Sequence, residues 1–253
     1  MAPLSRSAPP LIVLPARMGS TRLPGKPMAD IGGQPMIAHV VARALEAHLG
    51  PVVVACCEQE VARAATRAGA RAVMTDPDLP SGSDRAWAAV EAVDPEGHHD
   101  LIINLQADLP TLDPVLIRDV LAPLADPSVD IATPVARIVD PDEITDAGVV
   151  KAVVAFPPGR KASRALYFSR QPVPGGDGPH YHHIGLYAFR RAALAQFVRL
   201  PPSILEQRER LEQLRALENN MRIDAVLVDT VPLGVDTLED LEKARRLLAG
   251  GGA

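Results

Sequence analysis

Short apolar segments alternate with amphipathic helical patterns in the first part of the chain, and this alternation limits the fold more than any other sequence feature. Leu11–Leu14 and Val52–Ala55 are continuous apolar runs next to proline or glycine, as expected for strands buried on both faces. Between them, apolar residues recur every three or four positions from Met36 to Leu45, which predicts a helix. The same alternation predicts helices over 58–68 and 84–93 and strands over 71–74 and 101–105. This pattern is typical of an α/β fold with a doubly wound, mostly parallel, Rossmann-like sheet.

A less regular region follows, and it changes the expected organisation. Helices are expected over 113–124, 203–219 and 237–248, and β-like segments over 130–136, 149–155, 183–189 and 222–228. The stretch 156–179 is rich in proline and glycine, which predicts mobile loops. We expect one domain over 11–250, with 130–220 as an inserted mixed α+β region and 1–10 as a frayed leader.

Composition excludes several classes of function. With 26 Lys+Arg against 31 Asp+Glu, the chain has a formal net charge of −5, and only 3% of its residues are aromatic. A nucleic-acid partner is therefore not expected, because neither a basic surface nor base-stacking side chains are well supplied. No apolar run approaches the length that spans a bilayer, so no membrane insertion is expected. The two cysteines, Cys56 and Cys57, are adjacent and provide no disulfide framework, which favours a reducing, cytoplasmic location.

The most informative motif is the glycine-containing basic loop PARMGSTRLPGKP at 15–27, directly after the first expected strand. It brings together Arg17, Arg22 and Lys26 at the sheet edge where ligands bind in α/β folds, which points to a triphosphate. Five residues rather than four separate Gly19 from Gly25, and Pro27 follows the lysine, so the loop is not a Walker A motif. The glycine fingerprint of dinucleotide-binding folds is absent as well, which weakens an oxidoreductase alternative.

At this loop the chain resembles the 3-deoxy-D-manno-octulosonate (Kdo) cytidylyltransferases, also called CMP-Kdo synthetases. Six further blocks match in the same order, namely SGSDR at 81–85, NLQADLP at 104–110, ALYFSR at 165–170, HIGLY at 183–187, LEQLR at 211–215 and GVDT at 234–237. The resemblance extends over about 11–248. It implies transfer of CMP from CTP to the anomeric 2-hydroxyl of Kdo, with release of pyrophosphate, for synthesis of the lipopolysaccharide core.

Two aspartates are candidates for holding Mg²⁺. Asp108 follows the strand expected at 101–105, and Asp236 precedes the last expected helix. One or two carboxylates together with substrate phosphates suffice for Mg²⁺, and the resemblance implies this role for both residues. The alternatives are a solvated turn for Asp108 and a helix cap for Asp236. The catalytic set expected from the loop and the resemblance is Lys26, Arg17, Asp108 and Asp236.

The resemblance also implies binding residues for each substrate. We expect backbone groups of Leu14 to Arg17 and of the Ser81–Gly82 turn to contact the cytosine. The expected CTP-binding set is Leu14, Ala16, Arg17, Ser20, Arg22, Lys26, Ser81, Gly82 and Arg85. The expected sugar-binding set is Arg85, Gln106, His183, Tyr187, Glu212 and Gln213. Arg85 is the natural partner of the Kdo carboxylate because a guanidinium binds a carboxylate in a bidentate manner. His183 and Tyr187 are expected to project from one face of a single strand.

Some features leave alternatives open. Ala107 stands where the family usually has glycine, and Leu109 where many members have glutamate. The alternatives are therefore a cytidylyltransferase for another acidic sugar, such as a sialic acid or an amino-Kdo, and a CTP-binding module without turnover. The resemblance further implies a homodimer formed through the region around 160–220.

Overall fold

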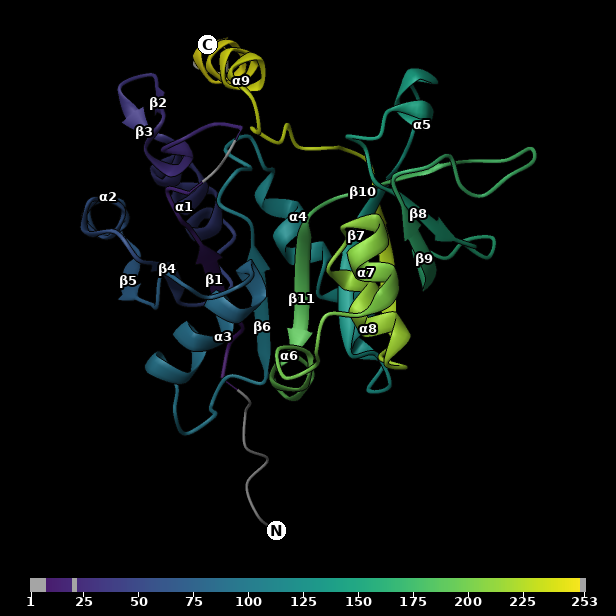
Figure 1. The fold of residues 1–253 in the computed structure, drawn as a ribbon, viewed down its shortest axis with the longest axis horizontal. Helices are drawn as coiled ribbons and strands as arrows, with labels where there is room; N and C mark the ends of the chain where they lie inside the picture. Colours follow the sequence, from purple (N-terminus) through teal and green to yellow (C-terminus); the bar gives the residue numbers. More distant parts are fainter. Residues whose placement is uncertain (1–7, 20–21, 251–253) are drawn as a thin grey trace. The chain divides into compact units, whose positions relative to one another are not determined.

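The computed structural model describes residues 8–19 and 22–250, and the chain divides into two compact units (Figure 1). Unit 1 contains the chain up to Pro114 and again from Leu233, and unit 2 contains Val115–Pro232. The inserted region expected at 130–220 lies within unit 2. Residues 1–7 of the expected leader lie outside the described residues.

Unit 1 alternates strands and helices as the apolar pattern predicts. Its elements are β1 (Leu11–Pro15), a 3₁₀ turn η1 (Lys26–Met28), β2 (Asp30–Ile31), β3 (Gln34–Pro35), α1 (Met36–Glu46), β4 (Val52–Cys56), α2 (Gln59–Arg67), β5 (Arg71–Met74), α3 (Gly82–Val93), β6 (Leu101–Leu105) and α9 (Leu238–Gly250).

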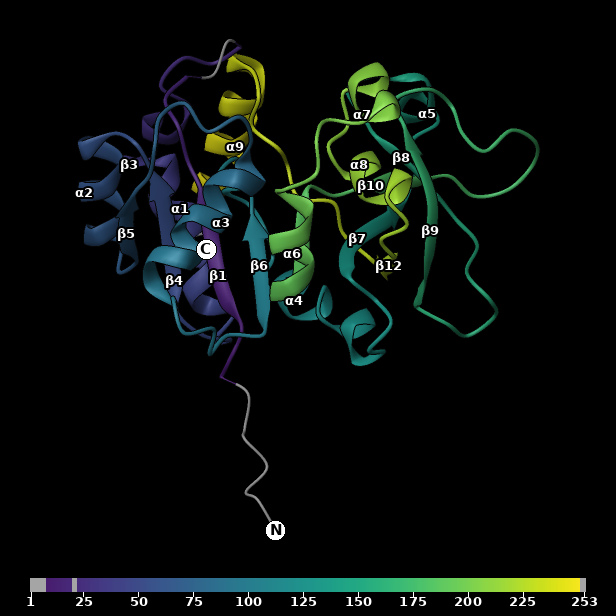
Figure 2. The ribbon, with the colours of Figure 1, turned by 60° about the horizontal axis from the view of Figure 1, so that its bottom comes forward.

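The main sheet of unit 1 is parallel, with strand order β6-β1-β4-β5. The central strands β1 and β4 are buried along their whole length, which explains their continuous apolar sequences. Helices α1 and α2 pack against each other, while α3 leads back from β5 to β6 and lies on the other face (Figure 2). The carboxyl ends of β1 and β6 therefore lie side by side, which is where such sheets bind ligands.

The end of the chain returns to unit 1 through a small hydrophobic cluster. Leu241 and Ala244 of α9 and Val235 before it are buried with Leu23, Ile31 and Met36. This packing joins the segment around Asp236 to the basic loop that follows β1.

Unit 2 is built from shorter elements. They are α4 (Pro114–Asp119), a 3₁₀ turn η2 (Ala122–Ala125), β7 (Ile131–Arg137), α5 (Asp142–Thr145), β8 (Lys151–Val154), β9 (Ala162–Ser169), β10 (Tyr181–His183), β11 (Leu186–Arg190), α6 (Arg191–Phe197), α7 (Ile204–Glu209), α8 (Gln213–Glu218) and β12 (Ile223–Val228).

The sheet of unit 2 is mixed, with strand order β10-β8-β9-β12-β7-β11. Strand β12 runs parallel to β7, whereas β8, β9, β10 and β11 make antiparallel pairs. Strand β10 also pairs with β7, which partly closes the sheet. The parallel sheet predicted for the first part of the chain is present in unit 1, but the sheet strands of the whole described chain are not mostly parallel. Unit 2, which contains the region predicted as mixed α+β, has a mixed sheet, because connections such as β8–β9 are too short for parallel crossovers.

Several expected elements differ in detail. The proline- and glycine-rich stretch 156–179 contains strand β9, whose buried Ala165 and Phe168 hold it to the sheet. The helix expected over 203–219 is two helices, because Arg210 adopts a left-handed conformation (φ 57°). The β segment expected at 183–189 is two strands, β10 and β11, separated by Ile184 and Gly185.

Within the part of the chain that the structure describes, no helix is long and apolar enough to cross a membrane.

The docking of α9 yields a stability prediction. Leu241 is 4% exposed, so Leu241→Ala should lower the free energy of unfolding by about 2–5 kcal/mol through lost burial and a cavity. Leu247 on the same helix is 58% exposed, and Leu247→Ala should change the free energy of unfolding by less than about 0.5 kcal/mol. Urea denaturation of both variants measures this free energy. Equal losses of stability in the two variants would show that α9 does not pack as described.

Candidate active site

A pocket of about 340 Å³ opens in unit 1 at the carboxyl ends of β1 and β6. Its lining combines the basic loop, the start of α3 and the residues after β6, and it consists of Pro15, Ala16, Arg17, Gly19, Arg22, Lys26, Pro27, Ser81, Gly82, Arg85, Gln106, Ala107 and Asp108. Its volume is within the range of small-ligand sites. Segments that are far apart in the sequence thus meet at the carboxyl edge of the sheet. This is the edge where the position of the loop after β1 predicts a ligand site.

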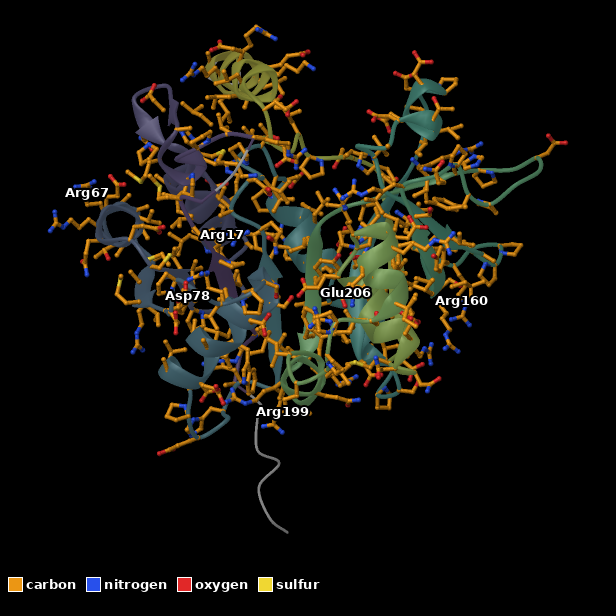
Figure 3. All side chains as sticks on the ribbon, in the orientation of Figure 1. Arg17, Arg67, Asp78, Arg160, Arg199 and Glu206 are labelled. Carbon is orange, nitrogen blue, oxygen red and sulfur yellow. The ribbon has the colours of Figure 1, made fainter. Side chains whose placement is uncertain are left out.

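The basic loop is held in place by hydrogen bonds from its backbone. The Met18 amide donates to Glu58 Oε1 at 3.0 Å, and the Gly25 amide donates to the Met18 carbonyl at 3.1 Å. Gly25 has a φ of 72°, which a glycine adopts without steric cost, and it turns the chain into η1. Arg17, labelled in Figure 3, comes from this loop and is exposed. Ser20, predicted to bind CTP, lies outside the described residues.

Lys26 joins the two predicted magnesium ligands. Its Nζ lies 2.7 Å from Asp108 Oδ2 and 2.9 Å from Asp236 Oδ1, and Arg22 Nη2 lies 2.9 Å from Asp236 Oδ2. The Lys26 side chain is 15% exposed. Burial alone would lower the pKa of Lys26, but the two carboxylates together outweigh it and raise that pKa. The ammonium group therefore stays charged between the two aspartates.

The backbone explains why the two carboxylates converge. The Val235 amide donates to the Asp108 carbonyl at 2.9 Å, which aligns the segment before α9 with the turn after β6. Thr237 and Asp240 cap the helix by exchanging hydrogen bonds between side chain and backbone. Asp236 is thus not needed as the side-chain cap of α9, and its carboxylate is directed to Lys26 and Arg22.

The donor set of this cluster fits a hard divalent cation. Two carboxylate oxygens approach a single cationic atom within 2.9 Å, and both side chains are partly exposed to solvent. Among the described residues, no group of three or more His, Cys, Asp or Glu side chains could hold a metal. Two carboxylates with remaining positions for water and phosphate oxygens suit Mg²⁺ rather than a transition metal.

The start of α3 presents backbone and a buried arginine to the pocket. Ser81 is the N-cap, and its Oγ accepts from the amides of Ser83 and Asp84 at 3.2 Å. Arg85 is only 2% exposed, and its guanidinium donates to Thr75 Oγ1 at 2.6 Å and to the Pro77 carbonyl at 3.3 Å. The structure therefore places Ser81, Gly82 and Arg85 together at the pocket, with part of the Arg85 donor capacity used within unit 1.

Gln106 is oriented by a neighbour in the last strand of the parallel sheet. Its Nε2 donates to Asn104 Oδ1 at 3.2 Å, and Asn104 is buried. The two positions that depart from the family pattern are also buried, with Ala107 in the pocket wall. Leu109 lies close to Gly234. An apolar side chain fits at this buried position, whereas a buried charged side chain would need a partner of opposite charge or a hydrogen-bond partner.

Unit 2 contains the other predicted sugar-binding residues, of which His183 and Gln213 are buried and Tyr187 and Glu212 are half-buried. His183 and Tyr187 lie on different strands, so the prediction that one strand face carries both is wrong, yet their ring centroids are 5.5 Å apart. Burial and, to a lesser extent, His182 lower the pKa of His183 to about 3. Burial and then Glu212 raise the pKa of Tyr187 well above its usual range. Both side chains are therefore neutral at physiological pH.

Gln213 supplies an unused donor in unit 2. It opens α8 and is 6% exposed, and its Nε2 is buried without a hydrogen-bond partner among the described residues. A buried amide donor without a partner costs free energy unless a ligand or water satisfies it. Glu206, labelled in Figure 3, fixes this helix by a bidentate pair with Arg215.

Sequence reasoning missed the residues that orient the others. Glu58 holds the basic loop, Thr75 anchors Arg85, Asn104 orients Gln106, and Thr133 contacts His183. Thr75 and Thr133 are ordinary threonines in the sequence, and only the packing of distant segments reveals their partners. Glu58 lies two residues after the end of β4, and this position near the ligand-binding edge of the sheet is a signal that the sequence offers.

Comparisons with known proteins agree with the geometry. The family described as "Cytidylyltransferase" matches residues 11–223. The chain is 65% identical over 239 residues to a 3-deoxy-manno-octulosonate cytidylyltransferase of Paramagnetospirillum magneticum, covering 94% of this chain and 97% of that protein. It is 61% identical over 248 residues to the protein of the same name from Rhodospirillum rubrum, covering 98% of each. A solved structure of CMP:2-keto-3-deoxy-manno-octonic acid synthetase complexed with CTP shares 39% identity, with a TM-score of 0.88, and covers 96% of this chain and 100% of that one.

The charge environment of Lys26 can be tested directly. Asp108→Asn removes the carboxylate that contributes most to the raised pKa, so the pKa of Lys26 should fall and more neutral amine should be present at a given pH. Competitive acetylation read by peptide mass spectrometry should then show faster modification of Lys26, with exposed Lys161 as the internal reference. An unchanged ratio of the two rates would contradict the described pairing.

Proposed function

The chain belongs to the family of 3-deoxy-manno-octulosonate cytidylyltransferases and forms CMP-Kdo from CTP and Kdo, and from this premise we propose how its residues carry out the transfer. The observation that supports the proposal most strongly is the convergence of Lys26, Asp108 and Asp236 beside the unit 1 pocket. The cationic group at this point can bind a triphosphate, and the two carboxylates can bind a divalent ion.

The transfer is a substitution at the α-phosphorus of CTP. A bond forms between that phosphorus and the anomeric 2-hydroxyl oxygen of Kdo, the bond to the bridging oxygen of the β-phosphate breaks, and pyrophosphate leaves while the hydroxyl loses its proton. Catalysis of such a step depends mostly on positioning and on neutralising charge. Arg17, Arg22 and Lys26 bind the triphosphate and stabilise the negative charge of the leaving pyrophosphate.

Asp108 and Asp236 hold Mg²⁺ in this proposal. The ion, when bound, supplies positive charge that favours the ionised form of the sugar hydroxyl. Because Lys26 contacts both carboxylates, it is well placed to contact a phosphate that binds beside them.

Each substrate has further contacts in the proposal. The backbone of Leu14, Ala16 and Arg17 and the turn at Ser81 and Gly82 bind the cytosine, since the Ser81 hydroxyl is already used as a helix cap. Arg85 binds the Kdo carboxylate with its remaining N–H groups, and Gln106 contributes a side-chain amide. Unit 2 contributes His183, Tyr187, Glu212 and Gln213 to the sugar hydroxyls.

We also propose a cytoplasmic location and a role in supplying lipopolysaccharide core synthesis. The cysteines Cys56 and Cys57 are both unpaired, which agrees with a reducing compartment.

The reaction is tested by measuring pyrophosphate release from CTP and Mg²⁺ with Kdo, with sialic acid and without a sugar. Release is expected only with Kdo, and a chelator should abolish it if the metal is required. Release that favours sialic acid would contradict the proposed sugar contacts, and CTP binding without any release would contradict the proposed catalytic set.

The metal assignment predicts the effect of one substitution. Asp236→Asn should fold normally, because Thr237 and Asp240 provide the cap of α9, and should lower kcat by about 100-fold or more through lost charge stabilisation. Asp229→Asn is the matched control, because that carboxylate is 88% exposed, lies 3.8 Å from Lys161 and is not among the residues that line the pocket. Circular dichroism checks folding, and near-normal turnover of the Asp236 variant would remove the metal assignment.

A homodimer is proposed through the region around 160–220. Two large apolar side chains of unit 2 in this range are strongly exposed, namely Leu166 at 60% and Ile204 at 80%. Light scattering after size exclusion should give twice the chain mass, and Leu166→Asp with Ile204→Asp should shift it to the monomer. A monomeric wild-type chain would contradict the proposal.

A further inference from the structure

The hydroxyl of Thr133 contacts three groups in unit 2, and their chemistry determines where its hydrogen lies. Thr133 is fully buried on β7. Its Oγ1 lies 2.9 Å from the Leu186 carbonyl, 3.2 Å from the Ile184 carbonyl and 2.9 Å from His183 Nε2. Carbonyl oxygens only accept hydrogen bonds, so the single hydroxyl hydrogen of Thr133 is required by the carbonyls.

The third contact must then take its hydrogen from the imidazole. If Thr133 donated to His183 instead, two buried carbonyl oxygens would face the hydroxyl lone pairs at 2.9 and 3.2 Å, which is unfavourable. We propose that Thr133 is a positioning residue that holds His183 as the Nε2–H tautomer, with Nδ1 as a hydrogen-bond acceptor for a sugar hydroxyl of the substrate. The inference deepens the proposed function, because it rests on the sugar-binding role of His183.

The surroundings of His183 fix the orientation of its ring and keep it neutral. His183 as a residue is 7% exposed, and its ring packs against the rings of Phe168 and Tyr187, with centroids 4.8 and 5.5 Å away, so its orientation is fixed by packing. Burial keeps the imidazole neutral, as its lowered pKa indicates. The buried Gln213 Nε2 without a partner shows that the same unit also offers an unused donor.

A neutral acceptor selects between the groups of an acidic sugar. The lone pair of Nδ1 attracts a hydroxyl hydrogen and repels a carboxylate oxygen. His183 therefore recognises a hydroxyl and does not bind the carboxylate. A protonated or Nδ1–H histidine would have the opposite preference.

The tautomer can be observed directly in the full chain. Long-range ¹H–¹⁵N spectra of ¹⁵N-histidine-labelled protein distinguish protonated from unprotonated ring nitrogens, and His183→Gln assigns the signal by its disappearance. The expected result is a protonated Nε2 and an unprotonated Nδ1 near pH 7. A protonated Nδ1, or both nitrogens protonated, would overturn the inference.

Substitution of Thr133 then connects the tautomer to binding. Thr133→Val removes the hydroxyl and should raise KM for Kdo by roughly three- to tenfold, the loss of one hydrogen bond, while KM for CTP stays unchanged. Thr133→Ser keeps the hydroxyl and should restore both the KM for Kdo and the tautomer. Thr66→Val, which removes an exposed hydroxyl on α2, controls for the change of residue type.

The outcomes distinguish a positioning role of Thr133 from a purely structural role and from failure of the proposed function. A merely structural Thr133 would lower the melting temperature of the valine variant without changing the tautomer or the ratio of the two KM values, and that result would overturn the inference. If the valine variant does not fold, the wild-type spectrum and the serine variant still decide it. Failure of the proposed function would appear instead as absent Kdo-dependent turnover in the wild-type chain, whatever the tautomer.

Discussion

The ion cluster of Lys26, Asp108 and Asp236 is the interaction on which the arrangement of unit 1 depends. It joins the loop after β1, which contains Lys26, to the turn after β6 and to the segment before α9. In the sequence, Asp108 of that turn is 82 positions from Lys26, and Asp236 of that segment is 210 positions from it. Burial of the lysine is unfavourable by itself, and the two carboxylates compensate for it. The hydrophobic cluster around Leu241 packs the segment before α9 against the loop after β1, and so supports one side of this ion cluster. With Arg22 paired to Asp236, the two cations and two carboxylates balance in charge. In the proposed function, these groups exchange partners with a triphosphate and a divalent ion.

The two units differ in the chemistry that they offer. Unit 1 presents charged side chains, including Arg17, Arg22 and Lys26, at a parallel sheet edge that suits phosphates. Unit 2 presents neutral polar groups whose charge is suppressed by burial, with His183 and Tyr187 as the main examples. In the proposed function, the charged groups serve the transfer step, where negative charge moves to the leaving group, and the neutral groups contact the hydroxyls of the sugar.

Much of unit 1 could be predicted from the sequence, because each buried strand reads as a continuous apolar run and each helix as a periodic one. The strands over 71–74 and 101–105 have the predicted bounds, and Asp108 and Asp236 meet as expected. Unit 2 could be predicted less well. Strand β9 is hidden between proline- and glycine-rich segments, and the left-handed Arg210 divides a helix whose residues all favour helix formation. The orienting roles of Glu58, Thr75 and Thr133 could not be predicted, because each depends on a partner brought near only by the fold.

The most direct test of the central claim is to locate the metal. Crystals grown with CTP and Mn²⁺, a substitute for Mg²⁺ with an anomalous signal, would show which side chains bind the ion. We predict an anomalous peak at coordination distance, about 2.0–2.2 Å, from oxygens of both Asp108 and Asp236, with the Lys26 ammonium displaced from between them to the triphosphate. A peak bound to other side chains, or Lys26 still between the two carboxylates with nucleotide and metal bound, would contradict the account.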